Sequence, residues 1–271
     1  MSGIYDQPEL YELACAYRDV PAEITAIEAW CARHHDGPVH RVLELAAGPA
    51  EHARELARRG LRSTALDRSP AMCANAAARA AETGIELAVF EADMRDFTIP
   101  GPGGGPSAFD LALTMLNSAC HLFTLDDLVR HLRAVRAQLA VGGLYIVELA
   151  HPADFFAPEP RTSSEWTVEA GGVRADVRWG GRGDHIDPLT QVTREHMTIT
   201  ATAADGTIRT VSDVVPNRFW TLTEFTAGIA LANAAGGGTL ELVASYGDFD
   251  DTTPLDAPTA WRMVLVLRRS R

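Results

Sequence analysis

The fold is decided by the stretch Val42-Leu43-Glu44-Leu45-Ala46-Ala47-Gly48-Pro49-Ala50. Residues 42–46 form a short apolar run that predicts a buried strand, and the small residues after it predict a tight turn. Residues 51–59 then show the pattern of a helix that ends at Gly60. A helix that begins directly after such a turn offers free backbone N–H groups to an anionic ligand.

The alternation of strand and helix continues outward from this stretch. Four more apolar strands are predicted, over residues 63–66, 87–90, 109–115 and 144–150, with helices over residues 71–81 and 126–139. Because these strands lack strict polar alternation and are joined by helices, they indicate a parallel sheet that is covered on both faces. Ahead of them, apolar spacing over residues 7–33 predicts two helices that meet near Pro21.

The pattern changes after His151. Four β-rich segments, separated by turn residues, predict an antiparallel insertion over residues 167–170, 173–179, 192–202 and 207–214. A helix over residues 225–234 and strands over 240–245 and 263–267 end the chain. We therefore expect a single α/β domain with a Rossmann-like, mostly parallel sheet of seven strands. Its expected parts are an N-terminal helical cap (1–37), a ligand-binding core (38–151), a β-rich lid (152–220), and a closing helix with strands (221–271).

The composition excludes several classes of site. The chain of 271 residues has a formal net charge of −12, and all 24 of its basic residues are Arg. Without a lysine, a P-loop nucleotide site, a pyridoxal Schiff base and a class A β-lactamase site are excluded. An acidic chain without a basic stripe also argues against a nucleic-acid or anionic-membrane partner.

The cysteines and the hydropathy pattern narrow the class further. The 4 cysteines lie far apart and form no CxxC pair, so neither a zinc site nor a disulfide framework is indicated. No His cluster has ligand spacing, and we expect no catalytic metal. No apolar run approaches the ~18 residues that a membrane span needs. We expect a soluble, cytoplasmic protein, and we leave a homodimer open.

Three acidic residues mark a ligand site at the carboxyl ends of the strands. Glu44 lies in the first strand, Asp67 ends the second, and Asp93 follows the third. An acid at the end of the second strand can accept hydrogen bonds from both hydroxyls of a ribose, and Asp93 could accept one from an adenine amino group. The pattern GxGxxG is absent, which disfavours a pyrophosphate. A nucleoside ligand that carries a carboxylate fits better.

These segments resemble the motifs of class I S-adenosylmethionine-dependent methyltransferases. The similarity covers residues 43–53, 65–72, 91–97, 109–118 and 139–145, in the order that the family shows. Leu10-Tyr11-Glu12, Tyr17-Arg18 and the β-rich insertion resemble small-molecule N-methyltransferases, namely the glycine N-methyltransferase-like and amino-sugar enzymes. The chain departs from the family at Ala46 and Ala50, where the family has glycine.

The resemblance implies that S-adenosylmethionine is the cofactor. Asp67 would hold its ribose, Asp93 would contact its adenine edge, and Gly48 would pass close to its methionine part. The expected cofactor-binding residues are Tyr11, Tyr17, Arg18, Glu44, Ala46, Gly48, Asp67, Arg68, Met72, Asp93, Met94, Met115, Leu116 and Asn117. Packing is the alternative interpretation for Tyr11, Met72 and Met94.

Methyl transfer needs positioning more than covalent help. His121, which follows the fourth strand, is the first candidate for a base, and His151 and Tyr11 are the others. The alternative for His121 is a histidine that lines the pocket without moving a proton. We expect a small-molecule acceptor, an amine first and a hydroxyl second. Two rival functions remain open: an NAD-dependent oxidoreductase and a non-catalytic nucleoside-binding protein.

Overall fold

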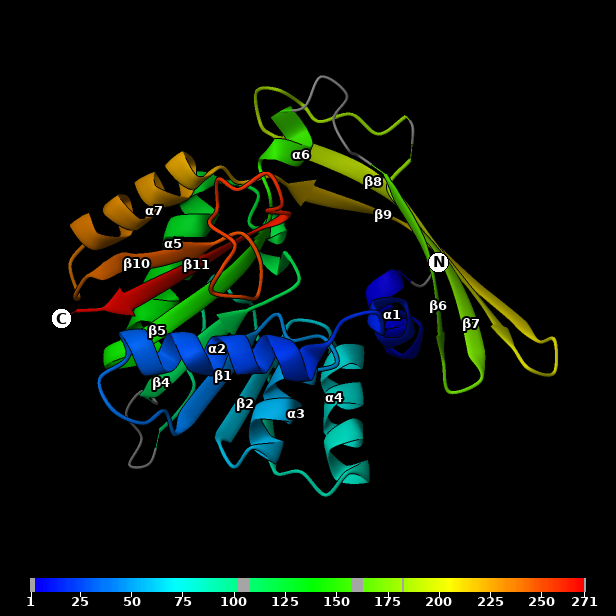
Figure 1. The fold of residues 1–271 in the computed structure, drawn as a ribbon, viewed down its shortest axis with the longest axis horizontal. Helices are drawn as coiled ribbons and strands as arrows, with labels where there is room; N and C mark the ends of the chain where they lie inside the picture. The colour runs from blue at the N-terminus through cyan, green and yellow to red at the C-terminus, as the bar shows by residue number, and fades with distance from the viewer. Residues whose placement is uncertain (1–2, 102–107, 157–162, 182, 271) are drawn as a thin grey trace.

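The strand–helix alternation of the first half is present in the computed structural model, which describes residues 3–101, 108–156, 163–181 and 183–270 (Figure 1). The strands of the main sheet are β1 (Arg41–Leu45), β2 (Arg62–Asp67), β3 (Leu87–Glu91), β4 (Phe109–Thr114), β5 (Leu139–Ala150), β10 (Leu240–Tyr246) and β11 (Arg262–Arg269). A second sheet contains β6 (Ser164–Ala170), β7 (Val173–Trp179), β8 (Val192–Ala203) and β9 (Ile208–Arg218). The helices are η1 (Ile4–Asp6), α1 (Pro8–Cys15), α2 (Val20–His34), α3 (Glu51–Arg58), α4 (Pro70–Glu82), η2 (Ser118–His121), α5 (Leu125–Gln138), α6 (Ala153–Phe156) and α7 (Leu222–Ala234).

The main sheet has the strand order β10-β11-β5-β4-β1-β2-β3. The strands β1 to β5 pair with their neighbours in parallel, and β11 runs antiparallel to both β5 and β10. The chain order reverses direction between β1 and β4, where an open α/β sheet leaves a crevice beyond the carboxyl ends of its strands. The turns after β1, β2 and β4 therefore meet at one edge.

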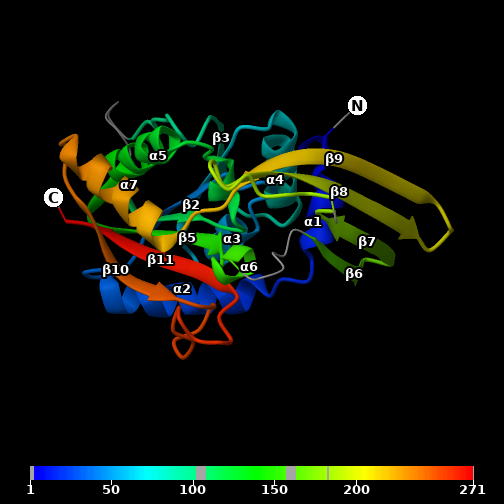
Figure 2. The ribbon, with the colours of Figure 1, turned by 90° about the horizontal axis from the view of Figure 1, so that it is seen from above.

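Helices cover both faces of the main sheet (Figures 1 and 2). On one face Ile24, Ile27 and Trp30 of α2 pack with Leu56 of α3 against the sheet. On the other face the side chains of α5 and α7 pack against the inward side chains of the same strands. The two buried layers agree with apolar strands that lack a polar side.

The second sheet is antiparallel throughout, in the order β6-β7-β8-β9, and extends away from the main sheet (Figures 1 and 2). The N-terminal elements divide between the two sheets: α2 packs on the main sheet, whereas Leu10 and Ala14 of α1 and Ile4 of η1 pack on the second. The Trp166 indole donates a hydrogen bond to the Ala14 carbonyl (2.9 Å). Only the first part of the helical cap, η1 and α1, thus forms one packed unit with the β-rich insertion.

Several element bounds differ from the sequence predictions. β5 begins at Leu139, because Leu139 already pairs with Phe109 before a register shift. β9 continues through Pro216, which a strand tolerates here because β9 is an edge of the second sheet. The short helices η1, η2 and α6 were not predicted, because segments of three or four residues carry too little periodicity.

Gly228 generates a prediction about packing between α7 and α5. A Cβ at position 228 would lie 2.6 Å from Cδ2 of Leu128, which is fully buried. Gly228→Ala gains about 1 kcal/mol of helix propensity but overpacks the contact, which costs about 1–3 kcal/mol. We expect a lower melting temperature, measured by calorimetry.

The matched comparison is the same substitution in a Leu128→Ala background. Removing the Leu128 side chain makes room for the new methyl group, so Gly228→Ala should then raise the melting temperature. Equal effects in both backgrounds would show that the two helices are not in tight contact at Gly228.

Candidate functional site

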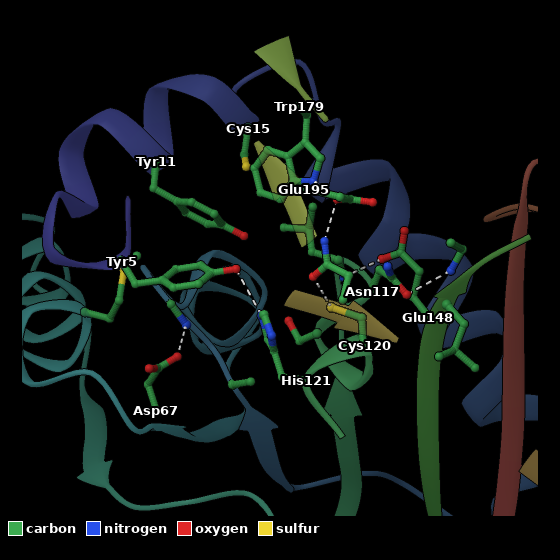
Figure 3. Close-up of a pocket in the computed structure, with 18 of the residues that line it drawn as sticks. Tyr5, Tyr11, Cys15, Asp67, Asn117, Cys120, His121, Glu148, Trp179 and Glu195 are labelled. Atoms are coloured by element: carbon green, nitrogen blue, oxygen red, sulfur yellow. Dashed lines mark hydrogen bonds between the residues drawn. The ribbon is translucent and has the colours of Figure 1, made fainter. Parts of the chain in front are cut away.

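A cavity of about 1010 Å³ opens at the carboxyl edge of the main sheet. Its floor comes from the turns after β1, β2 and β4, and its other walls come from η1, α1 and the second sheet (Figure 3). The lining includes these sequence-predicted residues: Tyr11, Tyr17, Arg18, Ala46, Gly48, Asp67, Arg68, Met72, Asp93, Met94, Leu116, Asn117 and His121. The structure therefore brings residues from most of the predicted motifs together around one space.

Glu44 and Met115 lie apart from this lining. Both border a small neighbouring pocket, and Met115 also belongs to the core under α2. The Glu44 carboxylate accepts a hydrogen bond from the Ala53 backbone N–H (2.7 Å), inside the first turns of α3. Glu44 thus fixes the start of α3 after the turn, while its predicted contact with a cofactor stays a prediction.

The turn after β1 has an unusual backbone. Ala46, Gly48 and Ala50 have φ angles of 48°, 53° and 58°, all in the left-handed region. For alanine this conformation costs roughly 1–2 kcal/mol per residue. Ala46 and Ala50, which stand where the family has glycine, therefore adopt the left-handed conformation that favours glycine. A Cβ at Gly48 would point toward Tyr11 and Met72, into the cavity.

Asp67 ties the ends of β1 and β2 together. Its carboxylate accepts hydrogen bonds from the Gly48 and Ser69 backbone N–H groups, both at 2.8 Å (Figure 3). Burial raises the pKa of Asp67, and these N–H groups oppose the rise. A carboxylate has about four acceptor positions, so these two bonds leave Asp67 with acceptor capacity for a ligand. Ser69 also caps α4 through Met72 N–H, as the sequence predicted.

Asp93 is held by a neighbour rather than free. Arg95 donates to both of its carboxylate oxygens and also reaches Asp127. The hydrogen bond from Arg95 lowers the pKa of Asp93, so the carboxylate is ionised. Arg95 lines the cavity as well, and it had not been identified from the sequence.

A network of buried charges lies behind the cavity. Arg18 donates to Glu23 (2.6 Å) and Glu148 (2.9 Å), and Arg262 also donates to Glu148 (3.0 Å). The Leu116 backbone N–H donates to the second Glu148 oxygen (2.8 Å). Arg18 therefore lines the cavity, as expected, but two carboxylates already neutralise its charge. Sequence reasoning missed both carboxylates. Glu148 reaches Arg18 only through the fold, and Glu23, although close in sequence, belongs to no motif.

His121 faces the cavity, and its ring is held by Tyr5. Its Nε2 lies 3.0 Å from the Tyr5 hydroxyl (Figure 3). Burial, assisted by the Arg68 charge, lowers the pKa of His121 to about 4. The imidazole is neutral at pH 7 and is a weak base. Tyr5 had not been identified, because it lies in η1 ahead of every motif.

The other two candidates for a base lie in different settings. The His151 ring is occupied by backbone groups: Nδ1 accepts from Ala153 N–H, so Nε2 donates to the Leu255 carbonyl. His151 is not among the described residues that line the cavity. Tyr11 does line it, but burial raises the pKa of its hydroxyl, which keeps the group protonated.

In the ranges that the structure describes, no three His, Cys, Asp or Glu side chains gather in a way that could hold a metal ion. No helix in those ranges is long and apolar enough to span a bilayer.

Comparisons with known proteins agree with this geometry. Residues 42–143 match the family model described as a methyltransferase domain. An S-adenosylmethionine-dependent methyltransferase from Clostridium acetobutylicum is 14% identical over 96% of each chain, with a TM-score of 0.76. The sugar N-methyltransferase KedS8 from Streptoalloteichus sp is 23% identical over 99% of this chain and 94% of its own, with a TM-score of 0.69.

A third structure is CalS10 from Micromonospora echinaspora, an amino pentose methyltransferase with bound S-adenosylmethionine. It is 23% identical over 92% of this chain and 90% of its own, with a TM-score of 0.62. No curated protein matches the sequence significantly. The family match and the shared fold confirm the predicted Rossmann-like class and the resemblance to class I methyltransferases.

The charge network generates a prediction about stability and pH. His52 lies between Glu23 (Nε2–Oε2, 2.8 Å) and Glu44 (Nδ1–Oε1, 3.3 Å). Burial opposes its charge, but the hydrogen bonds to these carboxylates prevail and raise the pKa of His52 from 6.5 to about 9. The stabilisation is complete below pH 6.5 and is lost as the pH rises through 9, a change on the order of 3 kcal/mol.

Denaturant unfolding between pH 6 and 9.5 measures this loss. The free energy of unfolding should fall across the range in the wild type and fall less in His52→Gln, because glutamine does not titrate there. His40→Gln, at an exposed position, is the matched control and should follow the wild type. Parallel curves for the wild type and His52→Gln would contradict a protonated His52.

Proposed function

We propose that this protein, whose residues 42–143 match a methyltransferase domain, transfers a methyl group from S-adenosylmethionine to a nitrogen of a small molecule. The observation that supports this proposal best is the hydrogen bond from the Gly48 N–H to the Asp67 carboxylate at the edge of a large cavity. Through it, a carboxylate with remaining acceptor capacity and a turn with a left-handed backbone face the same space. Two solved structures with this fold, the sugar N-methyltransferase KedS8 and the amino pentose methyltransferase CalS10, support the choice of nitrogen.

The residues present fit the cofactor. Asp67 would hold the ribose hydroxyls with its unused lone pairs. The cavity-facing side of Gly48 carries no Cβ and gives the methionine part room beside Tyr11 and Met72. Met94 and Arg68 would border the adenine, where both line the cavity. When bound, the cofactor supplies a methyl group that its positive sulfur activates toward attack.

The chain's own part in the reaction is placement. Tyr5, Tyr11 and His121 enclose the middle of the cavity, where ring centroids lie 5.6–5.7 Å apart (Figure 3). Enclosure by fixed rings excludes water and restricts the acceptor to few orientations. The Tyr5–His121 hydrogen bond fixes the imidazole, so it can orient an acceptor without moving.

The state of His121 favours nitrogen over oxygen as the acceptor atom. A hydroxyl ionises far above neutral pH, so it needs an effective base as the methyl group moves. His121, with its pKa lowered to about 4 by burial, is poorly matched to that task. The nitrogen of an amine needs a free lone pair that is correctly aimed at the moment of attack.

Asp67→Ala tests the cofactor site. Loss of hydrogen bonds to a charged group typically costs about 1.5–3 kcal/mol, which is about 10- to 150-fold in the dissociation constant for S-adenosylmethionine. Titration calorimetry measures it, with Asp96→Ala as a control because its carboxylate is largely exposed. An unchanged constant in a folded variant would remove Asp67 from the site, and tight binding of NAD instead would favour the oxidoreductase.

His121→Ala tests its role in turnover. If His121 only orients an amine, kcat should fall by roughly tenfold or less, and the pH profile between 6 and 9 should keep its shape. A base would cost about 10²–10⁴-fold. Steady-state rates with saturating cofactor distinguish the two. Tyr5→Phe, which removes the hydroxyl on Nε2, should give a loss of similar size to His121→Ala.

A further inference from the structure

Glu195 of β8 is a buried carboxylate in the wall of the cavity that the second sheet supplies. Only 6% of the residue is exposed. Its Oε2 accepts hydrogen bonds from the Trp179 indole (2.9 Å) and the Asn217 amide, and Asn217 in turn accepts one from the Cys120 thiol (Figure 3). Two donors, one of which is itself held by Cys120, therefore fix the position of this carboxylate before any ligand arrives.

Glu195 is a buried acid of the cavity without a cation, whereas two other acids of the cavity each have one. Glu148 is paired with Arg18 and Arg262, and Asp93 is paired with Arg95. Over the ranges that the structure describes, no ion pair involves Glu195, and its Oε1 accepts no hydrogen bond. A buried carboxylate without a counter-ion is unfavourable. Among the residues that the structure describes, this wall thus has one negative charge without a partner, and a cationic ligand can supply that partner.

Aromatic rings next to Glu195 suit the same kind of ligand. Trp179, which donates to Glu195, lies with its ring centroid 6.3 Å from Trp166 and 6.4 Å from Tyr11. These three side chains all line the cavity. The faces of indole and phenol rings attract cations, especially where water is excluded. In the view of Figure 3, Tyr5 and His121 stand between Glu195 and Asp67.

We infer that Glu195 recognises the acceptor as a protonated amine and takes its proton on Oε1. This inference rests on the function proposed above and adds the charge state of the substrate. In the proton transfer, an N–H bond of the ammonium breaks and an O–H bond forms on Glu195. The electron pair stays on nitrogen, which becomes neutral. That pair is the nucleophile that the proposed methyl transfer requires.

The titration behaviour of Glu195 supports this role. Burial raises the pKa of Glu195 to about 7, while the hydrogen bonds from Asn217 and Trp179 oppose the rise and the Asp184 charge adds to it. Such a carboxylate accepts a proton far more readily than His121 near pH 7. The other titratable groups around it are Tyr11 on α1, Cys120 on η2, Asp184 ahead of β8 and Asp213 on β9.

The test compares Glu195→Gln with Glu169→Gln, an exposed glutamate of the same sheet that loses the same charge. Three matched probe pairs serve as acceptors: glucosamine and glucose, benzylamine and benzyl alcohol, and cyclohexylamine and cyclohexanol. Product mass and kcat/KM are measured from pH 6 to 9. The dissociation constant for S-adenosylmethionine is measured separately. A wild type that does not bind S-adenosylmethionine would show that the proposed function itself is wrong.

We expect methylation of amines but not of their alcohols. Glu195→Gln should lower kcat/KM for an amine by about 10- to 150-fold, with cofactor binding and Glu169→Gln like the wild type. In the wild type kcat/KM should rise with pH through about 7, as Glu195 ionises, and this limb should vanish in Glu195→Gln. Equal kcat/KM in both proteins, methylation of alcohols only, or no product from a wild type that binds the cofactor would each overturn the inference.

Discussion

The site depends on buried charges that are stable only while each has its partner. Arg18, from the segment between α1 and α2, joins Glu23 to Glu148 of β5, and Arg262 of β11 closes the group. Removing one member of such a cluster leaves an unpaired charge, which typically costs about 3–5 kcal/mol. Glu148 also receives the Leu116 N–H, so the cluster sets the turn after β4. The position of the cavity floor thus follows from charge pairing behind it.

The sequence predicted the main sheet well, because its strands are apolar runs punctuated by Gly, Pro and Ser. The capped start of α4 at Ser69 and the turn at Gly48 were both visible as residue types. Asp67 could be placed because strand ends meet at one edge of a parallel sheet. Such local signals also located the second sheet, whose turns carry paired glycines or Asp-Gly.

The remaining parts of the site have no local signal. Tyr5, Glu148 and Glu195 reach the cavity only through contacts between distant segments, and neither spacing nor composition marks them. Pairing with other side chains and with backbone groups also changed the expected setting of predicted residues. Arg18 is neutralised by carboxylates, Asp93 is held by Arg95, and the His151 ring is occupied by backbone groups. Glu148 lies 130 residues from Arg18 and Leu255 lies 104 residues from His151, whereas Arg95 is close in sequence to Asp93.

The joint packing of α1 and the second sheet has a consequence for the order of folding. Ile4 N–H donates to Asp213 and the Trp166 indole donates to the Ala14 carbonyl, across 209 and 152 residues of chain. Hairpins such as β8–β9 need only local contacts, whereas the N-terminal segment can dock only on strands that already exist. Closing so long a loop adds little to the equilibrium cost. We therefore expect the cavity to form only after the strands of the second sheet have paired, because η1 and α1 complete its wall by docking on them.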